Sequence, residues 1–181
     1  QTALVAKQAA VADVLSNGRL RLGVGIGWNA VEYEGLGENF KNRGARSEEQ
    51  VELMRALWTQ EVVTFDGKWH KVRAAGINPL PIQRPIPVWF GGRADPLLRR
   101  TARIGDGLIV VSYHLPDERG ANAVQRMRRY AEEVGRDPDT LGLDGRANWL
   151  SGGLDGAVAE AEQWRALGAT HVSLNTMRAN L

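Results

Sequence analysis

The chain has 181 residues, of which 43% are hydrophobic and 24% are charged, with a formal net charge of +2. This is the composition of a soluble globular protein with a sizeable core, without the clustered positive charge that marks a nucleic-acid-binding surface. The chain has no cysteine, which excludes disulfides, thiolate metal ligands and cysteine nucleophiles. No apolar run approaches the roughly 18 residues that cross a bilayer, so we expect a cytoplasmic protein with no membrane partner and no nucleic-acid partner.

The first half of the chain predicts two helices, a strand and a hairpin. Apolar spacing predicts helices over 2–16 and 45–59, and a continuous apolar run predicts a strand over 20–26. Alternation over 62–72 around Asp66 and Gly67 predicts a β-hairpin with a two-residue type I′ turn. Four prolines make 78–87 an extended connector, so 60–85 is interpreted as an inserted hairpin with its connector.

The second half predicts strict alternation of strands and helices. We expect strands at 86–90, 107–111, within 141–149 and at 171–174, and helices at 96–103, 117–134 and 155–167. Continuously apolar strands such as Leu108-Ile109-Val110-Val111 indicate a parallel sheet covered on both faces. This order fits either a doubly wound sheet or a (β/α)₈ barrel. The chain begins directly in helical periodicity and stops after an apolar strand, so we expect residues 1–181 to be one incomplete domain.

Ligands of either fold meet the carboxyl ends of the strands, so the residues that follow each strand are the candidate site. They are aromatic, amide, hydroxyl and glycine residues with one histidine, which suits a planar ligand with polar edges and a phosphate. These residues are Gly27, Trp28 and Asn29; Gly91, Gly92 and Arg93; Ser112, Tyr113 and His114; Asn148 and Trp149; and Asn175 and Thr176.

The most specific of these positions is the turn Gly91-Gly92-Arg93. A strand that runs into two glycines and then a helix brings backbone N–H groups, a helix N-terminus and an arginine together, which predicts an anion site. The opposing interpretation is that Asp95 caps the helix and Pro96 is its first residue, so that the helix needs no ligand and its carboxylate repels phosphate.

Three other sequence patterns give weaker evidence for a functional site. Gly25 to Ala30 matches the letters G-x-G-x-x-A of a dinucleotide fingerprint, but no helix follows at once and no acidic residue ends a following strand. The three histidines have no metal-ligand spacing. His114 is either a base or a loop residue, and Arg126, Arg128 and Arg129 are most simply the solvated face of a helix.

An ordered set of short motifs resembles the bacterial luciferase-like monooxygenases and their deazaflavin-dependent relatives. The motifs run through essentially the whole chain, and their order is more specific than any one of them. They are the stretch from Leu15 to Asn29, Glu32-Tyr33, Arg43-Gly44, Leu57-Trp58, Phe65-Asp66-Gly67, the stretch from Pro85 to Gly92, Gly105-Asp106-Gly107, and the stretch from His171 to Met177.

The resemblance implies the fourth to eighth strands of a (β/α)₈ barrel, a partial TIM barrel. It implies FMN or coenzyme F420 as cofactor, and either hydride transfer with a small organic substrate or flavin-mediated oxygenation. The implied cofactor-binding residues are Ile26, Gly27, Gly91, Gly92 and Arg93. The substrate pocket is expected to include Trp28, Asn29, His114 and Asn175.

Two departures from the family pattern limit what the resemblance transfers. Trp28 stands where the branch that oxidises glucose 6-phosphate has a catalytic glutamate, so glucose 6-phosphate is not the substrate we expect. The first three strands, which carry catalytic His and Trp residues in the deazaflavin enzymes, have no counterpart here, so no catalytic residue is assigned.

Three functional hypotheses follow. The first is a flavin- or deazaflavin-dependent oxidoreductase, present as a truncated chain. The second is a catalytically inactive partial barrel that keeps phosphate or cofactor affinity as a binding or assembly module, and the third is an unrelated α/β enzyme. Unpaired sheet edges also predict a homo-oligomer.

Overall fold

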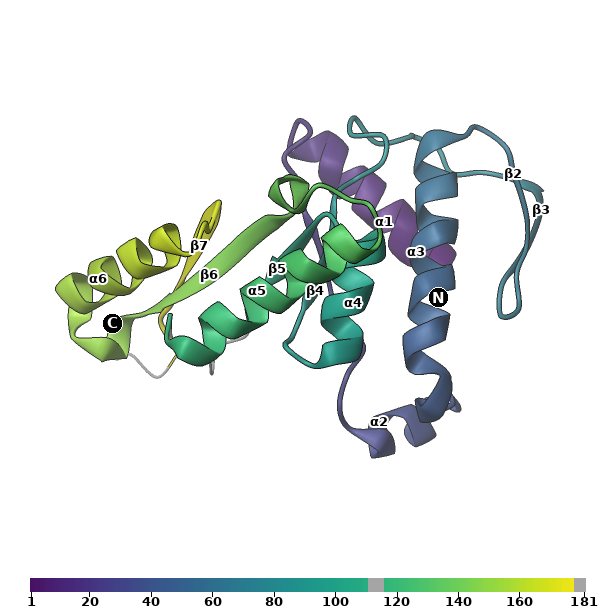
Figure 1. The fold of residues 1–181 in the computed structure, drawn as a ribbon. Helices are drawn as coiled ribbons and strands as arrows, with labels where there is room; N and C mark the ends of the chain where they lie inside the picture. Colours follow the sequence, from purple (N-terminus) through teal and green to yellow (C-terminus); the bar gives the residue numbers. More distant parts are fainter. Residues whose placement is uncertain (111–115, 178–181) are drawn as a thin grey trace. The chain divides into compact units, whose positions relative to one another are not determined.

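The structure, a computed structural model, describes residues 1–110 and 116–177. The chain forms two compact units, Gln1–Val88 and Trp89–Leu181 (Figure 1). The longer elements of the first unit are α1 (Thr2–Leu15), β1 (Leu22–Val24), α2 (Ala30–Gly35), α3 (Arg43–Thr59), β2 (Val63–Asp66) and β3 (Lys71–Ala75). Those of the second unit are β4 (Val88–Gly91), which begins at the boundary, α4 (Asp95–Ile104), β5 (Gly107–Ile109), α5 (Glu118–Glu133), β6 (Gly142–Asn148), α6 (Gly153–Ala166) and β7 (His171–Asn175).

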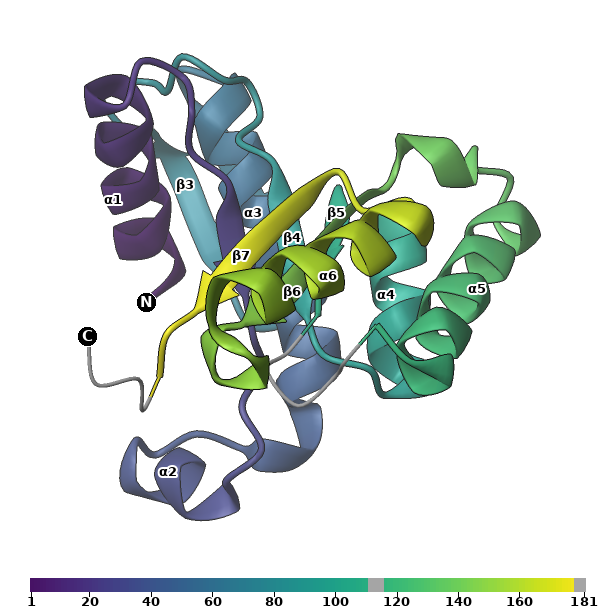
Figure 2. The ribbon, with the colours of Figure 1, turned by 90° about the vertical axis from the view of Figure 1, so that its left-hand side faces the viewer.

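The two long helices of the first unit, α1 and α3, pack against each other (Figure 2). Trp58 on α3 is fully buried, and its indole Nε1–H donates a hydrogen bond to the Ala6 carbonyl of α1 at 2.9 Å. Ala6, Ala9 and Ala10 of α1 are buried, and their small side chains allow the close approach of the two helices. The apolar residues whose spacing predicted α3 are buried and form the core of this unit; they are Val51, Leu53, Met54, Leu57 and Trp58.

The hairpin between α3 and β4 is present, but its predicted two-residue type I′ turn is wrong. Asp66 pairs with Lys71, so four residues, 67–70, form the loop. The Glu49 carboxylate of α3 accepts hydrogen bonds from the backbone N–H groups of Lys68, Trp69 and His70 at 2.7–2.8 Å. A side chain about twenty residues away thus satisfies the donors of the loop, which the local sequence pattern did not reveal.

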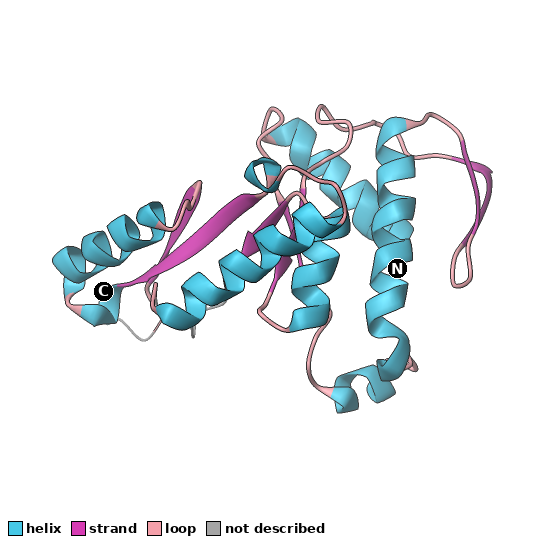
Figure 3. Cartoon of the chain, in the orientation of Figure 1, coloured by secondary structure: helices cyan, strands magenta, loops and turns pink. Residues whose placement is uncertain are grey.

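The strands of the second unit are parallel, and helices separate them in the sequence (Figure 3). Within the second unit the hydrogen-bonding order is β4-β5-β6-β7. Within the first unit, Leu22 N–H at the start of β1 donates to the Pro87 carbonyl at 2.9 Å. The expected α/β alternation is confirmed. Strand β1 is shorter than the expected 20–26, and the short helix α2 lies where a loop was expected, begun by the Asn29 side chain.

The core of the second unit is organised around two tryptophans. The Trp89 ring of β4 fills the space that side chains would take at Gly107 and Gly142, the first residues of β5 and β6. A Cβ at Gly107 would lie 2.5 Å from the indole, so only glycine admits the ring there. Trp164 of α6 is fully buried, and its Nε1–H donates to the Arg146 carbonyl of β6 at 3.0 Å.

Among the described residues, no helix combines the length and the apolar character that a membrane span requires.

A buried carboxylate fixes the connector to α1. Asp13 is fully buried, and its two carboxylate oxygens accept hydrogen bonds from the Gln83 backbone N–H at 2.9 Å, the Gln83 side-chain amide at 2.7 Å and the Leu20 N–H at 3.4 Å. Burial alone would raise the pKa of Asp13, but the hydrogen bonds from Gln83 and Leu20 outweigh it and lower the pKa.

We expect Asp13→Ala to destabilise the chain by about 3 kcal/mol in urea unfolding at pH 7, because the charged acceptor of buried donors is lost. The folded pKa is lowered, so the contribution of Asp13 is fully present above its ordinary pKa and is lost as the pH falls through the folded value. The difference between wild type and variant should therefore shrink in acid. Asp139→Ala, at an exposed aspartate, is the control. Equal stability of Asp13→Ala and the wild type at pH 7 would show that the carboxylate does not hold the connector.

Strand β7 has one neighbour, β6, in the sheet that the described residues form. Val172 and Leu174 on this strand are 40% and 53% exposed, whereas His171, Ser173 and Asn175 point to the other face, where they contact Trp89, Asp144 and Asn148. An outer strand with apolar side chains is a template for pairing with another chain.

We propose that β7 pairs with a second copy of the chain. The wild type should then elute as a dimer or larger species in size-exclusion chromatography with light scattering, and Val172→Lys with Leu174→Lys should shift it to the monomer. Val62→Lys with Val134→Lys, at two exposed valines outside the strand, should leave the assembly intact. A wild-type chain that is monomeric at high micromolar concentration contradicts the proposal.

Candidate functional site

The turn between β4 and α4 is shaped by Gly92. Strand β4 is buried through Phe90 and runs into Gly91 and Gly92. Gly92 has φ +138°, a value that side chains strongly disfavour, and a Cβ there would lie 2.9 Å from Leu97 Cδ1. Its N–H donates to the Ile109 carbonyl at the end of β5, at 3.3 Å. No side chain at Gly91 or Gly92 covers the backbone of the turn, and the Gly92 N–H is engaged by β5, so the donors that remain for a ligand come from the residues after it.

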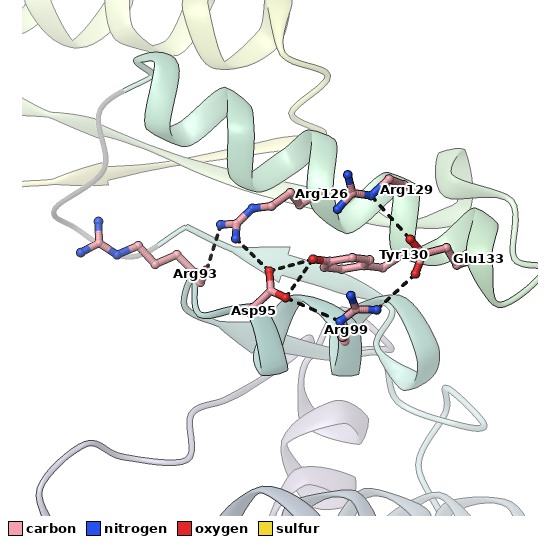
Figure 4. Close-up of polar contacts among 7 residues, drawn as sticks. All are labelled: Arg93, Asp95, Arg99, Arg126, Arg129, Tyr130 and Glu133. Atoms are coloured by element: carbon pink, nitrogen blue, oxygen red, sulfur yellow. Dashed lines mark hydrogen bonds and ion pairs between the residues drawn. The ribbon is translucent and has the colours of Figure 1, made fainter.

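The predicted capping of α4 by Asp95 is wrong. The N-cap is Ala94, the helix has no side-chain cap, and Asp95 and Pro96 are its first two residues. The Asp95 carboxylate points across to α5, as Figure 4 shows, where it accepts hydrogen bonds from the Tyr130 hydroxyl at 2.8 and 2.9 Å. Stronger partners on another helix thus draw the carboxylate away from the N–H groups of its own first turn. No side chain therefore caps α4. Because Pro96 has no N–H and Leu97 N–H donates to the Ala94 carbonyl at 2.8 Å, the Asp95 N–H is the donor of the first turn that remains for a ligand.

The charge of Asp95 is neutralised by its neighbours. The Tyr130 hydroxyl lowers the pKa of Asp95 most, and the nearby Arg126 and Arg99 guanidinium groups lower it further, against a partial burial that raises it. Arg126 Nη1 lies 2.8 Å and Arg99 Nε 3.6 Å from its oxygens. A phosphate at the turn therefore meets an aspartate already paired with two cations.

The same contacts connect α4 to α5 (Figure 4). The Arg99 guanidinium carbon stacks 3.8 Å from the centre of the Tyr130 ring, and both Arg99 and Arg129 pair with Glu133. Arg129 is 61% exposed, as expected for a solvated helix face, but that interpretation is wrong for Arg126. Sequence reasoning missed Tyr130 altogether. The only local signal was the spacing of four residues that places Arg126 and Tyr130 on one face of α5.

A hollow of about 440 Å³ lies beside the turn, lined by Arg93, Glu118, Arg119, Asn122, Ala123 and Arg126. Among the described residues the Arg93 guanidinium has no ion-pair partner, and no dashed line reaches it in Figure 4. Helix α5 begins at this hollow and is capped by Asp117, whose carboxylate accepts from Gly120 N–H and Arg119 N–H at 3.0 Å. These bonds lower the pKa of Asp117. The hollow is therefore lined by three guanidinium groups and a single carboxylate, that of Glu118.

The carboxyl ends of β6 and β7 meet through a chain of amides. Asn175, a predicted pocket residue, donates from Nδ2 to Asn148 Oδ1 at 2.9 Å. Asn148 in turn donates from its backbone N–H and from Nδ2 to the buried Glu160 carboxylate of α6, at 2.8 and 3.0 Å. Glu160 thus orients both amides at the rim of the sheet, and nothing in the local sequence around Asn175 pointed to it.

Four further predicted residues belong to the first unit. The Ile26 carbonyl accepts a hydrogen bond from the Tyr33 hydroxyl at 2.5 Å. The next residue, Gly27, has φ +69°. Trp28 is 86% exposed, and the Asn29 side chain accepts from Val31 N–H and begins α2. Asn29 therefore has a capping role, and the ligand roles of Ile26, Gly27 and Trp28 stay predictions. His114 lies outside the described residues, as do Ser112 and Tyr113.

The other two histidines have structural partners. His70 Nδ1 lies 2.8 Å from the Glu49 carboxylate and its Nε2 lies 2.8 Å from the Thr2 hydroxyl, while His171 packs edge-on against Trp89. Within residues 1–110 and 116–177, no group of three or more His, Asp or Glu side chains is arranged to hold a metal ion.

Comparison with known proteins gives one consistent family. The model of the luciferase-like monooxygenases matches residues 1–148. An uncharacterized protein of Mycobacterium tuberculosis is 39% identical over 134 residues, covering 74% of this chain and 45% of that protein. The F420-dependent glucose-6-phosphate dehydrogenase of Mycolicibacterium gilvum is 34% identical over 143 residues, covering 77% of this chain and 42% of the dehydrogenase. The chain thus spans less than half the length of these two relatives.

A solved structure agrees with this assignment at the level of the fold. The coenzyme F420-dependent tetrahydromethanopterin reductase of Methanopyrus kandleri superposes with a TM-score of 0.79 at 16% identity, covering 96% of this chain and 73% of the reductase chain. This likeness confirms the fold expected from the sequence, the later part of a (β/α)₈ barrel with an inserted hairpin. The family model covers more than half of the chain, so the chain belongs to the luciferase-like monooxygenase family.

Proposed function

We propose that the β4–α4 turn binds the phosphate of a flavin-type cofactor, FMN or coenzyme F420, and that the chain is the cofactor-binding part of an oxidoreductase acting on a small organic substrate. One observation carries the proposal. A backbone turn made by Gly91 and Gly92 leads into a helix with no side-chain cap, beside an Arg93 guanidinium that has no ion-pair partner among the described residues.

The residues of the turn fit a phosphate. The N–H groups of a helix N-terminus carry partial positive charge and favour anions. In α4 no side chain caps the first turn, Pro96 has no N–H and Leu97 N–H donates to the Ala94 carbonyl, which leaves the Asp95 N–H for a ligand. Gly92 cannot carry a side chain without meeting Leu97, so the backbone stays accessible. Arg93 adds a full positive charge, and Asp95, the nearest acid in the first turn, is paired with Arg126 and Arg99.

The part of this chain in catalysis would be binding and orientation. A bound flavin or deazaflavin supplies hydride transfer or oxygen chemistry, as members of this type of enzyme do. The turn holds the anionic end of the cofactor, and the Asn175 amide, fixed by Asn148 and Glu160, presents a rigid polar group at the ends of the neighbouring strands. Glucose 6-phosphate is not the substrate we propose, because Trp28 occupies the position where the resemblance expects a glutamate.

A second candidate is a binding or assembly module that keeps cofactor affinity without turnover. The observations at the turn support it equally, since they concern the binding of an anion and assign no catalytic residue. Turnover by the isolated chain with a bound cofactor would eliminate this candidate, whereas binding without turnover would favour it.

The proposal predicts that cofactor affinity depends on Arg93. In fluorescence titrations with FMN and with coenzyme F420, Arg93→Glu should weaken binding by about 30-fold or more, since a charge-assisted hydrogen bond contributes about 1.5–3 kcal/mol and the reversal adds repulsion. The matched control is Arg165→Glu on α6, which changes the net charge equally at a site 78% exposed and should bind as the wild type does. Equal affinity of Arg93→Glu and the wild type, with circular dichroism showing both folded, would remove the turn as the phosphate site.

A further inference from the structure

A hydroxyl, an imidazole and a carboxylate lie in a row within the first unit, and none of them belongs to the β4–α4 turn. His70 Nδ1 lies 2.8 Å from Glu49 Oε1, and His70 Nε2 lies 2.8 Å from the Thr2 hydroxyl. The three side chains come from α3, the hairpin loop and α1, so the fold brings together residues that are 21 and 68 positions apart. A carboxylate, an imidazole and a hydroxyl in this order activate the hydroxyl as a nucleophile.

The Glu49 carboxylate determines which nitrogen of the His70 ring carries the proton. Burial alone would raise the pKa of Glu49, but the hydrogen bonds from His70 and from the loop N–H groups outweigh it and lower the pKa. The carboxylate is therefore ionised at neutral pH and can only accept, so the proton of the neutral ring is on Nδ1. The lone pair of Nε2 then faces the Thr2 hydroxyl, which donates to it. His70 is thus placed as a general base for Thr2.

The three groups are held on fixed elements. Glu49 also accepts hydrogen bonds from the backbone N–H groups of Lys68 and Trp69, which fix the loop that carries His70. The hydrogen bond from Trp58 to Ala6 holds α1 against α3. The side chains of Glu49 and His70 are 11% and 18% exposed, so water weakens their interaction little. Groups already held in place before a substrate arrives are what catalysis requires.

Thr2 also lines a hollow of about 160 Å³, together with residues of α1, β1 and α3. Val5, Val24, Val51 and Met54 make the surface of this hollow mostly apolar. A dry cavity of roughly 150 Å³ holds a molecule of the size of benzene. The hollow therefore fits a short apolar chain.

Gln50 places one amide in the same lining, one residue after Glu49 on α3. A side-chain amide at such a position can donate to a carbonyl oxygen that gains negative charge during acyl transfer. The hollow thus combines a nucleophile, an apolar wall and a hydrogen-bond donor.

We propose that Thr2, His70 and Glu49 form an esterase site whose substrates carry a short apolar acyl group. The Thr2 oxygen attacks the ester carbonyl carbon while His70 Nε2 takes the hydroxyl proton. The bond from the carbonyl carbon to the alcohol oxygen breaks, and His70 gives the proton to the departing alcohol. A water molecule, deprotonated by the same imidazole, then hydrolyses the acyl-threonine and restores the hydroxyl. Glu49 stabilises the imidazolium that forms in both steps.

The test is the hydrolysis of p-nitrophenyl butyrate by the whole chain, followed through the absorbance of the released nitrophenolate. Thr2→Val should lower kcat/KM about 100-fold or more, since a positioned base alone contributes roughly that factor. Valine keeps the shape of threonine, so α1 should pack as before. Thr59→Val is the matched control and should keep full activity, because Thr59 is exposed and its hydroxyl donates to the Arg55 carbonyl.

Two further measurements separate catalysis from a structural role of Thr2. Acid quenching during turnover, followed by peptide mass spectrometry, should recover a butyryl group on Thr2, whereas a threonine that only holds the hairpin carries none. Val5→Phe narrows the hollow at a wall residue that is 39% exposed. It should raise KM for the butyrate ester and leave KM for the acetate ester unchanged.

Three results would overturn the inference. The first is hydrolysis by the wild type no faster than in buffer alone, and the second is equal hydrolysis by the wild type and Thr2→Val with both folded by circular dichroism. The third is a butyryl group on a lysine or on His70 in place of Thr2. The inference is independent of the proposed cofactor site, so Thr2→Val should bind FMN and coenzyme F420 as the wild type does.

Discussion

The Asp95 carboxylate links the start of α4 to the middle of α5, and the candidate site depends on this link. Because Tyr130 and Arg126 hold the carboxylate across the helix pair, it does not cap its own helix. The Asp95 N–H in the first turn of α4 is therefore left for a ligand, since Pro96 has no N–H and Leu97 N–H donates to the Ala94 carbonyl. The carboxylate nearest to it is paired with Arg126 and Arg99. The same contact places Arg126 of α5 next to the glycine turn.

The order of elements could be predicted from the sequence because it is encoded locally. The apolar strand before Gly91 and the helix after Pro96 are visible in the residues themselves, and Gly92 does adopt a backbone conformation that favours glycine. Local patterns also located the candidate turn, since strand ends, glycines and an arginine are all features of a short segment. Asn175 was likewise placed correctly at the end of its strand.

The predictions that were wrong share one physical cause, a partner distant in the sequence. Aspartate is a residue type that often caps helices, which made Asp95 a candidate N-cap. Its partners Arg126 and Tyr130, however, lie 31 and 35 residues away in the sequence. The dipeptide Asp66-Gly67 is typical of a two-residue turn. The Glu49 carboxylate, however, accepts hydrogen bonds from a four-residue loop there. Local propensities of this kind amount to about 1 kcal/mol, which one charge-assisted hydrogen bond offsets.

The proposed anion site is the backbone of the β4–α4 turn. Backbone amide chemical shifts test it most directly, through a titration of the ¹⁵N-labelled chain with FMN or coenzyme F420 followed by nuclear magnetic resonance. We predict that the largest saturable shifts fall on the N–H groups of Arg93, Ala94 and Asp95, because the Gly92 N–H already donates to the Ile109 carbonyl. Saturable binding with these three amides unmoved, and the large shifts elsewhere in the chain, would contradict it.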